Sequence, residues 1–134
     1  MIAQGLDMKM HHIGIATDDI LKMQLYLQQI TTVVEIGETV YDEKQDASLS
    51  MVTLGDGTKI ELIAGKVVEK IVKKRNFLYH ICYEVADIEK KIEQLVEYGA
   101  MLISESKEAI LFGGRRVAFL MTPMGMIELL EQEV

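Results

Sequence analysis

Two histidines and two glutamates are the residues of this chain whose types and spacing could do metal chemistry. His12 and His80 each precede an isoleucine and lie 68 residues apart, and Glu61 and Glu128 each sit in an Ile-Glu-Leu sequence and lie 67 residues apart. Imidazole and carboxylate ligands together suit divalent Co, Ni, Mn, Zn or Fe. The sequence therefore predicts a divalent-metal site and leaves the identity of the metal open.

The matching spacings indicate an internal repeat, in which the two halves of the chain share one sequence pattern. Each half alone would be a poor core-former, because small units bury too little of their surface. We therefore expect a single domain over residues 1–134 with two modules, one over about 9–64 and one over about 77–131.

The first module reads as a strand, a helix and three further strands. Asp18-Asp19 supplies the helix cap, and the Asp-Gly step in Gly55-Asp56-Gly57 is typical of a hairpin. The expected strands are Lys9–Ala16, Val33–Tyr41, Ala47–Leu54 and Thr58–Ala64. Met1–Met8 shows no clear period and is expected to be a loose tail.

The second module repeats this order after a connector, Gly65–Asn76, that is expected to hold one helical turn. Asp87 caps its helix and Gly99 ends it. The expected strands are Phe77–Val85, Ala100–Ser104, Arg115–Met121 and Met126–Glu131. The predicted class is α+β, with βαβββ modules forming a curved mixed sheet.

Strand alternation predicts where the four candidate ligands point. Glu61 and Glu128 have apolar residues on both sides, and His12 and His80 are each followed by an isoleucine. These neighbours lie on the opposite strand face, so all four side chains project from one side if the apolar faces pack on the helices. By the same parity His11 lies on the other face from His12 and is expected to be structural or exposed.

Composition limits the possible partners. The formal net charge of −7 disfavours nucleic acid and anionic membranes, both of which attract clustered Lys and Arg. Cys82 is the only cysteine, so no internal disulfide can form, and no apolar run is long enough to span a bilayer. We expect a cytoplasmic protein with a small-molecule partner, no nucleic acid and no membrane.

Several of these stretches resemble one family. The His12-Ile-Gly-Ile strand, the run Tyr79-His-Ile-Cys-Tyr-Glu-Val85 and the two Ile-Glu-Leu sequences resemble the vicinal oxygen chelate superfamily (glyoxalase, bleomycin resistance, dioxygenase), with methylmalonyl-CoA epimerase-like proteins closest. The resemblance covers Lys9 to Glu131. It implies a glyoxalase-like fold enclosing a metal held by His12, Glu61, His80 and Glu128.

The resemblance also implies an activity. A bound metal would stabilise an enediolate formed by removal of an α-proton, with Glu128 as the catalytic base, in a metal-dependent isomerase or epimerase. A glyoxalase I (lactoylglutathione lyase) type enzyme and a non-catalytic, antibiotic-binding protein of the same fold are the alternatives. The implied substrate has vicinal oxygens, as in an acyl-CoA or a glutathione adduct, and a homodimer is expected.

Four further residues are expected to contact substrate. Ser50 lies on the third strand of the first module, where some of these epimerases carry a second glutamate and this chain has no acid. Glu84 shares the strand face of His80 by parity. Arg115 and Arg116 follow Gly113-Gly114 and could meet a phosphate or carboxylate.

Overall fold

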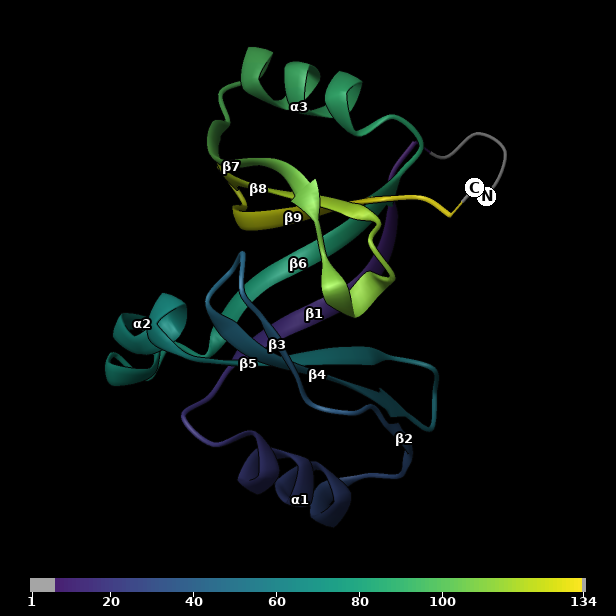
Figure 1. Ribbon diagram of the computed structural model, residues 1–134, viewed down its shortest axis with the longest axis vertical. Coiled ribbons are helices and arrows are strands. Elements are labelled where there is room, and N and C mark those ends of the chain that lie inside the picture. Colours follow the sequence, from purple (N-terminus) through teal and green to yellow (C-terminus); the bar gives the residue numbers. More distant parts are fainter. Residues whose placement is uncertain (1–6, 134) are drawn as a thin grey trace. The chain divides into compact units, whose positions relative to one another are not determined.

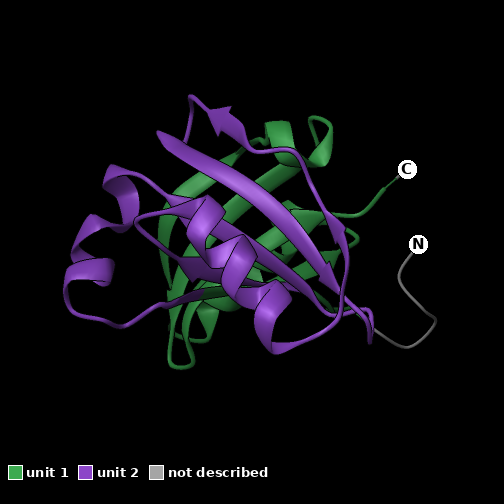
Figure 2. Ribbon diagram, turned by 90° about the horizontal axis from the view of Figure 1, so that it is seen from below, with its two compact units in different colours: residues 1–11, 80–134 green, residues 12–79 purple. Residues whose placement is uncertain are grey.

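The computed structural model, which describes residues 7–133, has the predicted βαβββ order in the second half of the sequence and the same order in the first half with the strand after the helix in two pieces (Figure 1). The chain divides into two units, coloured in Figure 2: unit 2 is residues 12–79, and unit 1 is the described part of residues 1–11 and 80–134. The fold is therefore α+β, with one repeat of the element pattern in each half of the sequence. No helix among residues 7–133 is long and apolar enough to cross a membrane.

Unit 2 begins within the first strand. Its elements are β1 (Lys9–Ala16), α1 (Ile20–Ile30), β2 (Val33–Ile36), β3 (Val40–Asp42), β4 (Ala47–Leu54), β5 (Lys59–Ala64), the short 3₁₀ turn Lys66–Val68 and α2 (Glu69–Lys73). Strands β2, β4, β5 and β1 are neighbours in that order, and β3 pairs with β4. The β1–β5 pair is parallel, whereas the β4 pairs are antiparallel.

Unit 1 holds the second copy. Its elements are β6 (Leu78–Val85), α3 (Ile88–Glu97), β7 (Met101–Glu108), the 3₁₀ turn Ile110–Phe112, β8 (Arg116–Thr122) and β9 (Gly125–Glu131). The strand order is β6-β9-β8-β7, and the β6–β9 pair is parallel like β1–β5. Each half thus places the strand with the histidine beside the strand with the glutamate.

Local chemistry sets the helix ends as expected. The side chains of Asp19 and Asp87 accept hydrogen bonds from the backbone N–H groups of Lys22 (3.0 Å) and Lys90 (3.1 Å), which caps α1 and α3. Gly99 has φ 102° just after α3, a backbone conformation that favours glycine.

The helices α1 and α3 each cover one face of the strands in their own unit. In unit 2 the core cluster is Ile20, Leu27, Val52 and Leu62, and in unit 1 it is Val85, Ile88, Ile92, Ala100, Ala118, Leu120, Ile127 and Leu129. Full burial of one such aliphatic side chain contributes roughly 1.5–3 kcal/mol. These contacts fix which strand face is covered by helix, and residues of the other parity point to the opposite face.

Four expectations needed correction. The strand expected at Ala100–Ser104 runs over Met101–Glu108. Val33–Tyr41 is two strands, β2 and β3, which both pair with β4; the ladder is interrupted because three residues between Ile36 and Val40 face two between Val52 and Leu49. The connector holds both a 3₁₀ turn and a short α-helix. Of the expected loose tail, residues 1–6 lie outside the described residues, whereas Asp7 contacts Lys91 Nζ (2.6 Å) and Met8 packs on the unit 1 core.

Candidate metal centre

His12 and Glu61 meet in unit 2. The parallel register sets Gly14 of β1 opposite Glu61 of β5, and His12 shares the strand face of Gly14 two residues earlier. Both side chains are buried, and His12 Nε2 lies 3.3 Å from Glu61 Oε1. Leu62, the neighbour of Glu61, packs in the cluster under α1, so the pair occupies the face away from that helix.

His80 and Glu128 form the matching pair in unit 1. Cys82 of β6 lies opposite Glu128 of β9, and His80 is again two residues earlier on the same face. His80 Nε2 lies 3.0 Å from Glu128 Oε1, and both residues are buried. Ile127 and Leu129, on either side of Glu128, pack under α3. The two units therefore repeat one arrangement.

The geometry of each pair fits metal ligation. Two ligand atoms that each lie about 2.1 Å from a zinc-like ion, at tetrahedral or octahedral angles, are about 3.0–3.4 Å apart. The two Nε2–Oε1 distances, 3.3 and 3.0 Å, fall in this range. The same separation suits an imidazole N–H that donates a hydrogen bond to the carboxylate when no metal is bound.

Phe119 supports the unit 1 pair, and sequence reasoning missed it. It is the cross-strand partner of Glu128 in the antiparallel β8–β9 pair, and its ring packs edge-on against that of His80, with centroids 5.4 Å apart. This contact fixes the orientation of the imidazole. Strand alternation in Arg115–Met121 carried the signal, since Ala118 and Leu120 face the helix.

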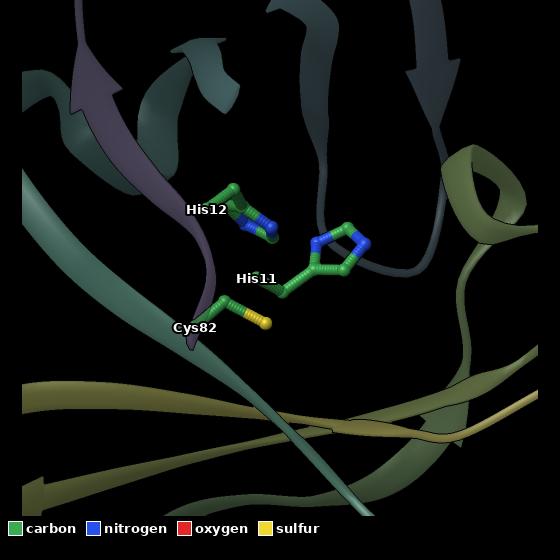
Figure 3. A group of neighbouring side chains, drawn as sticks. All are labelled: His11, His12 and Cys82. Carbon is green, nitrogen blue, oxygen red and sulfur yellow. The ribbon is translucent and has the colours of Figure 1, made fainter. Parts of the chain in front are cut away.

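His11 and Cys82 lie near each other in unit 1. Figure 3 shows their side chains, and a nitrogen of His11 lies within 4.8 Å of Cys82 Sγ. The His11 ring is half-buried and packs edge-on against Phe112, with centroids 5.6 Å apart. Cys82 is buried on the strand face of His80, so the expectation that His11 faces away from the candidate ligands is wrong, although its ring does pack against Phe112.

Ser50 lies on the other side of its sheet from Glu61. It pairs with Leu62 across β4 and β5, on the face that α1 covers. Its hydroxyl accepts a hydrogen bond from Gln24 Nε2 (2.9 Å) and donates one to the carbonyl of Gly37 (3.0 Å). Because the hydroxyl is buried and engaged twice, we leave Ser50 out of the proposed substrate contacts.

Glu84 and Arg115 are bound to each other. Arg115 Nη2 donates a short hydrogen bond to Glu84 Oε2, and Arg115 Nε donates to the backbone carbonyl of Glu131 (2.8 Å). Both side chains are mostly buried. A substrate anion would have to displace Glu84 to reach this guanidinium, so the two residues act first as a structural ion pair.

Arg116 lies on the strand face opposite to that of Arg115, beside α3. Its guanidinium donates to Glu131 Oε2 (2.9 and 3.1 Å) and to Glu89 Oε1 (3.1 Å). Hydrogen bonding to Glu131 raises the pKa of Arg116, and hydrogen bonding to Arg116 holds the pKa of Glu131 below its ordinary value. The structure thus separates Arg116 from the face that carries His80 and Glu128.

Comparison with known proteins agrees with the fold. A family model described as the Glyoxalase/Bleomycin resistance protein/Dioxygenase superfamily matches residues 11–119. No curated protein matches the chain.

Three solved structures illustrate the likeness. Methylmalonyl-CoA epimerase from Mycobacterium tuberculosis is 21% identical, with a TM-score of 0.80 over 100% of this chain and 94% of that one. A hypothetical protein from Bacillus halodurans is 26% identical, with a TM-score of 0.70 over 95% and 96%. A single-residue variant of the Streptomyces coelicolor methylmalonyl-CoA epimerase, in complex with 2-nitronate-propionyl-CoA, is 19% identical, with a TM-score of 0.76 over 96% and 97%.

Proposed function

Because the chain belongs to the glyoxalase/bleomycin resistance protein/dioxygenase superfamily, we propose that it is a metal-dependent isomerase or epimerase that removes a proton next to the carbonyl of an acyl-CoA. The proposed ligands of one divalent ion are His12, Glu61, His80 and Glu128. The solved epimerases with a similar fold support this choice of substrate class.

The repeated histidine–glutamate pair carries the proposal. Four polar side chains, each 2% exposed or less, occupy equivalent places in the two halves of the sequence. Burying such groups is costly unless hydrogen bonds or a metal compensate. A fold stabilised by apolar packing alone would not need the same polar pair twice.

The chemistry follows from the donor set. A bound divalent ion would stabilise the negative charge that develops on the substrate carbonyl oxygen as the α-proton leaves. We assign the transfer of that proton to Glu128, whose carboxylate is a general base of the usual kind. Phe119 and the buried thiol of Cys82 flank this carboxylate, and both help to keep water away from it.

Metal analysis is the first test. Elemental analysis of the purified chain should find about one divalent ion per chain in the wild type and in His11→Ala. The ion should be lost in His80→Ala and in His80→Gln, both checked for folding by circular dichroism. His11→Ala is the matched control, since His11 is also a half-buried ring on β1 but forms no part of either pair. Wild type that takes up no Co, Ni, Mn or Zn would refute the proposal.

Activity distinguishes the reaction. In deuterated water the metal-loaded chain should exchange the α-proton of methylmalonyl-CoA, and Glu128→Gln should abolish the exchange. Turnover of the hemithioacetal of glutathione and methylglyoxal, without any acyl-CoA exchange, would instead establish a glyoxalase. A metal-free chain that binds an antibiotic without turnover would establish a binding protein. The expected homodimer stays a prediction, which sedimentation equilibrium can check.

A further inference from the structure

A hollow lies in unit 2 where β1 ends and α1 begins. It has a volume of about 310 Å³ and is lined by Thr17, Asp18, Lys22, Met23, Tyr26 and Phe77. Tyr26 and Phe77 are 52% and 41% exposed, so both rings offer apolar surface to a ligand. Neither ring belongs to the core cluster of unit 2, which lies on the buried side of α1.

The second copy of the fold supplies an internal comparison. With the 68-residue offset of the repeat, Lys22, Met23 and Tyr26 correspond to Lys90, Lys91 and Gln94. Those three residues also line a hollow, in unit 1. There Lys91 Nζ donates to Asp7 Oδ2 (2.6 Å) and Gln94 Oε1 (2.5 Å), so the polar groups satisfy one another. Only the unit 2 copy presents aromatic rings.

A second hollow adjoins the aromatic one. It has a volume of about 420 Å³, shares Thr17 and Asp18 with the first, and is also lined by Gly65, Lys66, Glu69, Val72 and Lys73. Residues 66–75 contain five basic side chains and one acidic one, in a chain whose net charge is −7. Within the described residues, no ion pair uses Lys22, Lys66 or Lys73.

An aromatic surface beside free cations suits a ligand that joins a flat ring to several negative charges. Bases stack on aromatic side chains whatever their sequence, and lysine ammonium groups bind phosphates as point charges. Asp18 and Glu69 repel an anion and offset part of this positive charge. A ligand with several negative charges is therefore attracted more strongly than one with a single carboxylate, and an uncharged ring would gain no attraction from the lysines.

We propose that the two adjoining hollows bind the phosphorylated adenosine end of a coenzyme A thioester, with adenine against Tyr26 and Phe77 and phosphates near Lys66 and Lys73. The choice of coenzyme A over other nucleotides rests on the proposed function. The hollows lie at the ends of β1 and β5, the parallel strands that carry His12 and Glu61, a place where ligands often bind in open sheets. Thr17 follows His12 by five residues, about 16 Å along a strand, which the flexible pantetheine arm would span.

Calorimetric titration of the full chain tests the site. Coenzyme A and adenosine 3′,5′-bisphosphate should both bind, and pantetheine and pyrophosphate should bind at least tenfold more weakly. Two variants should each weaken bisphosphate binding tenfold or more. One is the double variant Lys66→Gln/Lys73→Gln, and the other is Tyr26→Gln, which places at position 26 the residue type of its equivalent, Gln94. Lys90→Gln, the equivalent lysine of unit 1, is the matched control and should bind as the wild type does.

Three results would overturn the inference: no binding of the bisphosphate, equal binding of pyrophosphate, or wild-type affinity in both unit 2 variants. Its failure can be separated from failure of the proposed function. Proton exchange into a short N-acetylcysteamine thioester, which lacks the nucleotide, depends on the metal site alone. Exchange with equal kcat/KM for the short and the coenzyme A thioesters would refute the nucleotide site only, whereas bisphosphate binding without any exchange would refute the catalytic proposal only.

Discussion

Replacing Ser50 by alanine separates a structural role from a substrate contact. The change removes the hydroxyl that joins Gln24 of α1 to the carbonyl of Gly37, two contacts of 2.9 and 3.0 Å. The amide of Gln24 is buried and would lose its acceptor, while the Gly37 carbonyl is only partly buried. Leaving one buried donor unsatisfied and losing a second hydrogen bond costs roughly 2 kcal/mol in the free energy of unfolding.

The assay is urea and thermal unfolding followed by circular dichroism. For a chain of 134 residues, an unfolding entropy of about 2.1 cal/mol/K per residue converts roughly 2 kcal/mol into a fall in Tm of about 7 °C. Ser48→Ala is the control, because Ser48 shares the strand face of Ser50 and makes no side-chain hydrogen bond within the described residues. Its stability should change by less than about 0.5 kcal/mol.

Unchanged stability in Ser50→Ala, together with a raised KM for substrate, would refute the hypothesis that the Ser50 hydroxyl has a structural role. It would mean that the hydroxyl serves a ligand and that the contacts to Gln24 and Gly37 contribute nothing. A fall in stability with unchanged KM would agree with the structure.

Three further changes should have measurable effects. Phe119→Leu removes the edge contact to His80 and should lower the free energy of unfolding by about 1–2 kcal/mol, measured in urea; equal midpoints would contradict the contact. Glu131→Gln should cost at most about 1 kcal/mol at neutral pH, because both partners are partly exposed. Hydrogen bonding to Arg116 lowers the pKa of Glu131 from 4.5, so this contribution to stability is full above pH 4.5 and is lost below it. The difference in stability between wild type and Glu131→Gln should therefore vanish in acid. A difference that grew in acid would contradict this assignment of the ion pair. Gly99→Ala places a Cβ at φ 102° with no atom within 4 Å, so backbone strain alone should cost about 1 kcal/mol in thermal unfolding, and an unchanged Tm would show that the residue relaxes freely.

Strand parity was enough to predict the faces of the candidate ligands. The flanks of Glu61 and Glu128 are apolar on both sides, and those flanking residues do pack under the helices. Parity alone could not say that each histidine would lie beside a glutamate. That depends on the parallel pairings β1–β5 and β6–β9, which join residues far apart in the sequence.

The expected substrate contacts show where sequence patterns stop being informative. In β4 both faces carry apolar and small polar residues, so alternation could not place Ser50 on the helix side. Arg115 and Arg116 are adjacent and look alike in the sequence, yet they bind Glu84 and Glu131 on different faces. Ion pairs between distant residues leave no local signal.

The assignment of residues 7–11 to unit 1 affects how the chain can fold during synthesis. Asp7 is 84 residues from Lys91, its ion-pair partner, and Met8 packs with residues of β6, α3 and β8. These first residues leave the ribosome long before their partners are made. Closing so long a loop is slow to occur by chance, so the N-terminal segment should dock last, after the second copy has formed its own sheet. Although the sequence reads as a tandem duplication, a ribosome-bound fragment that stops at the connector should therefore leave this segment exposed to proteases.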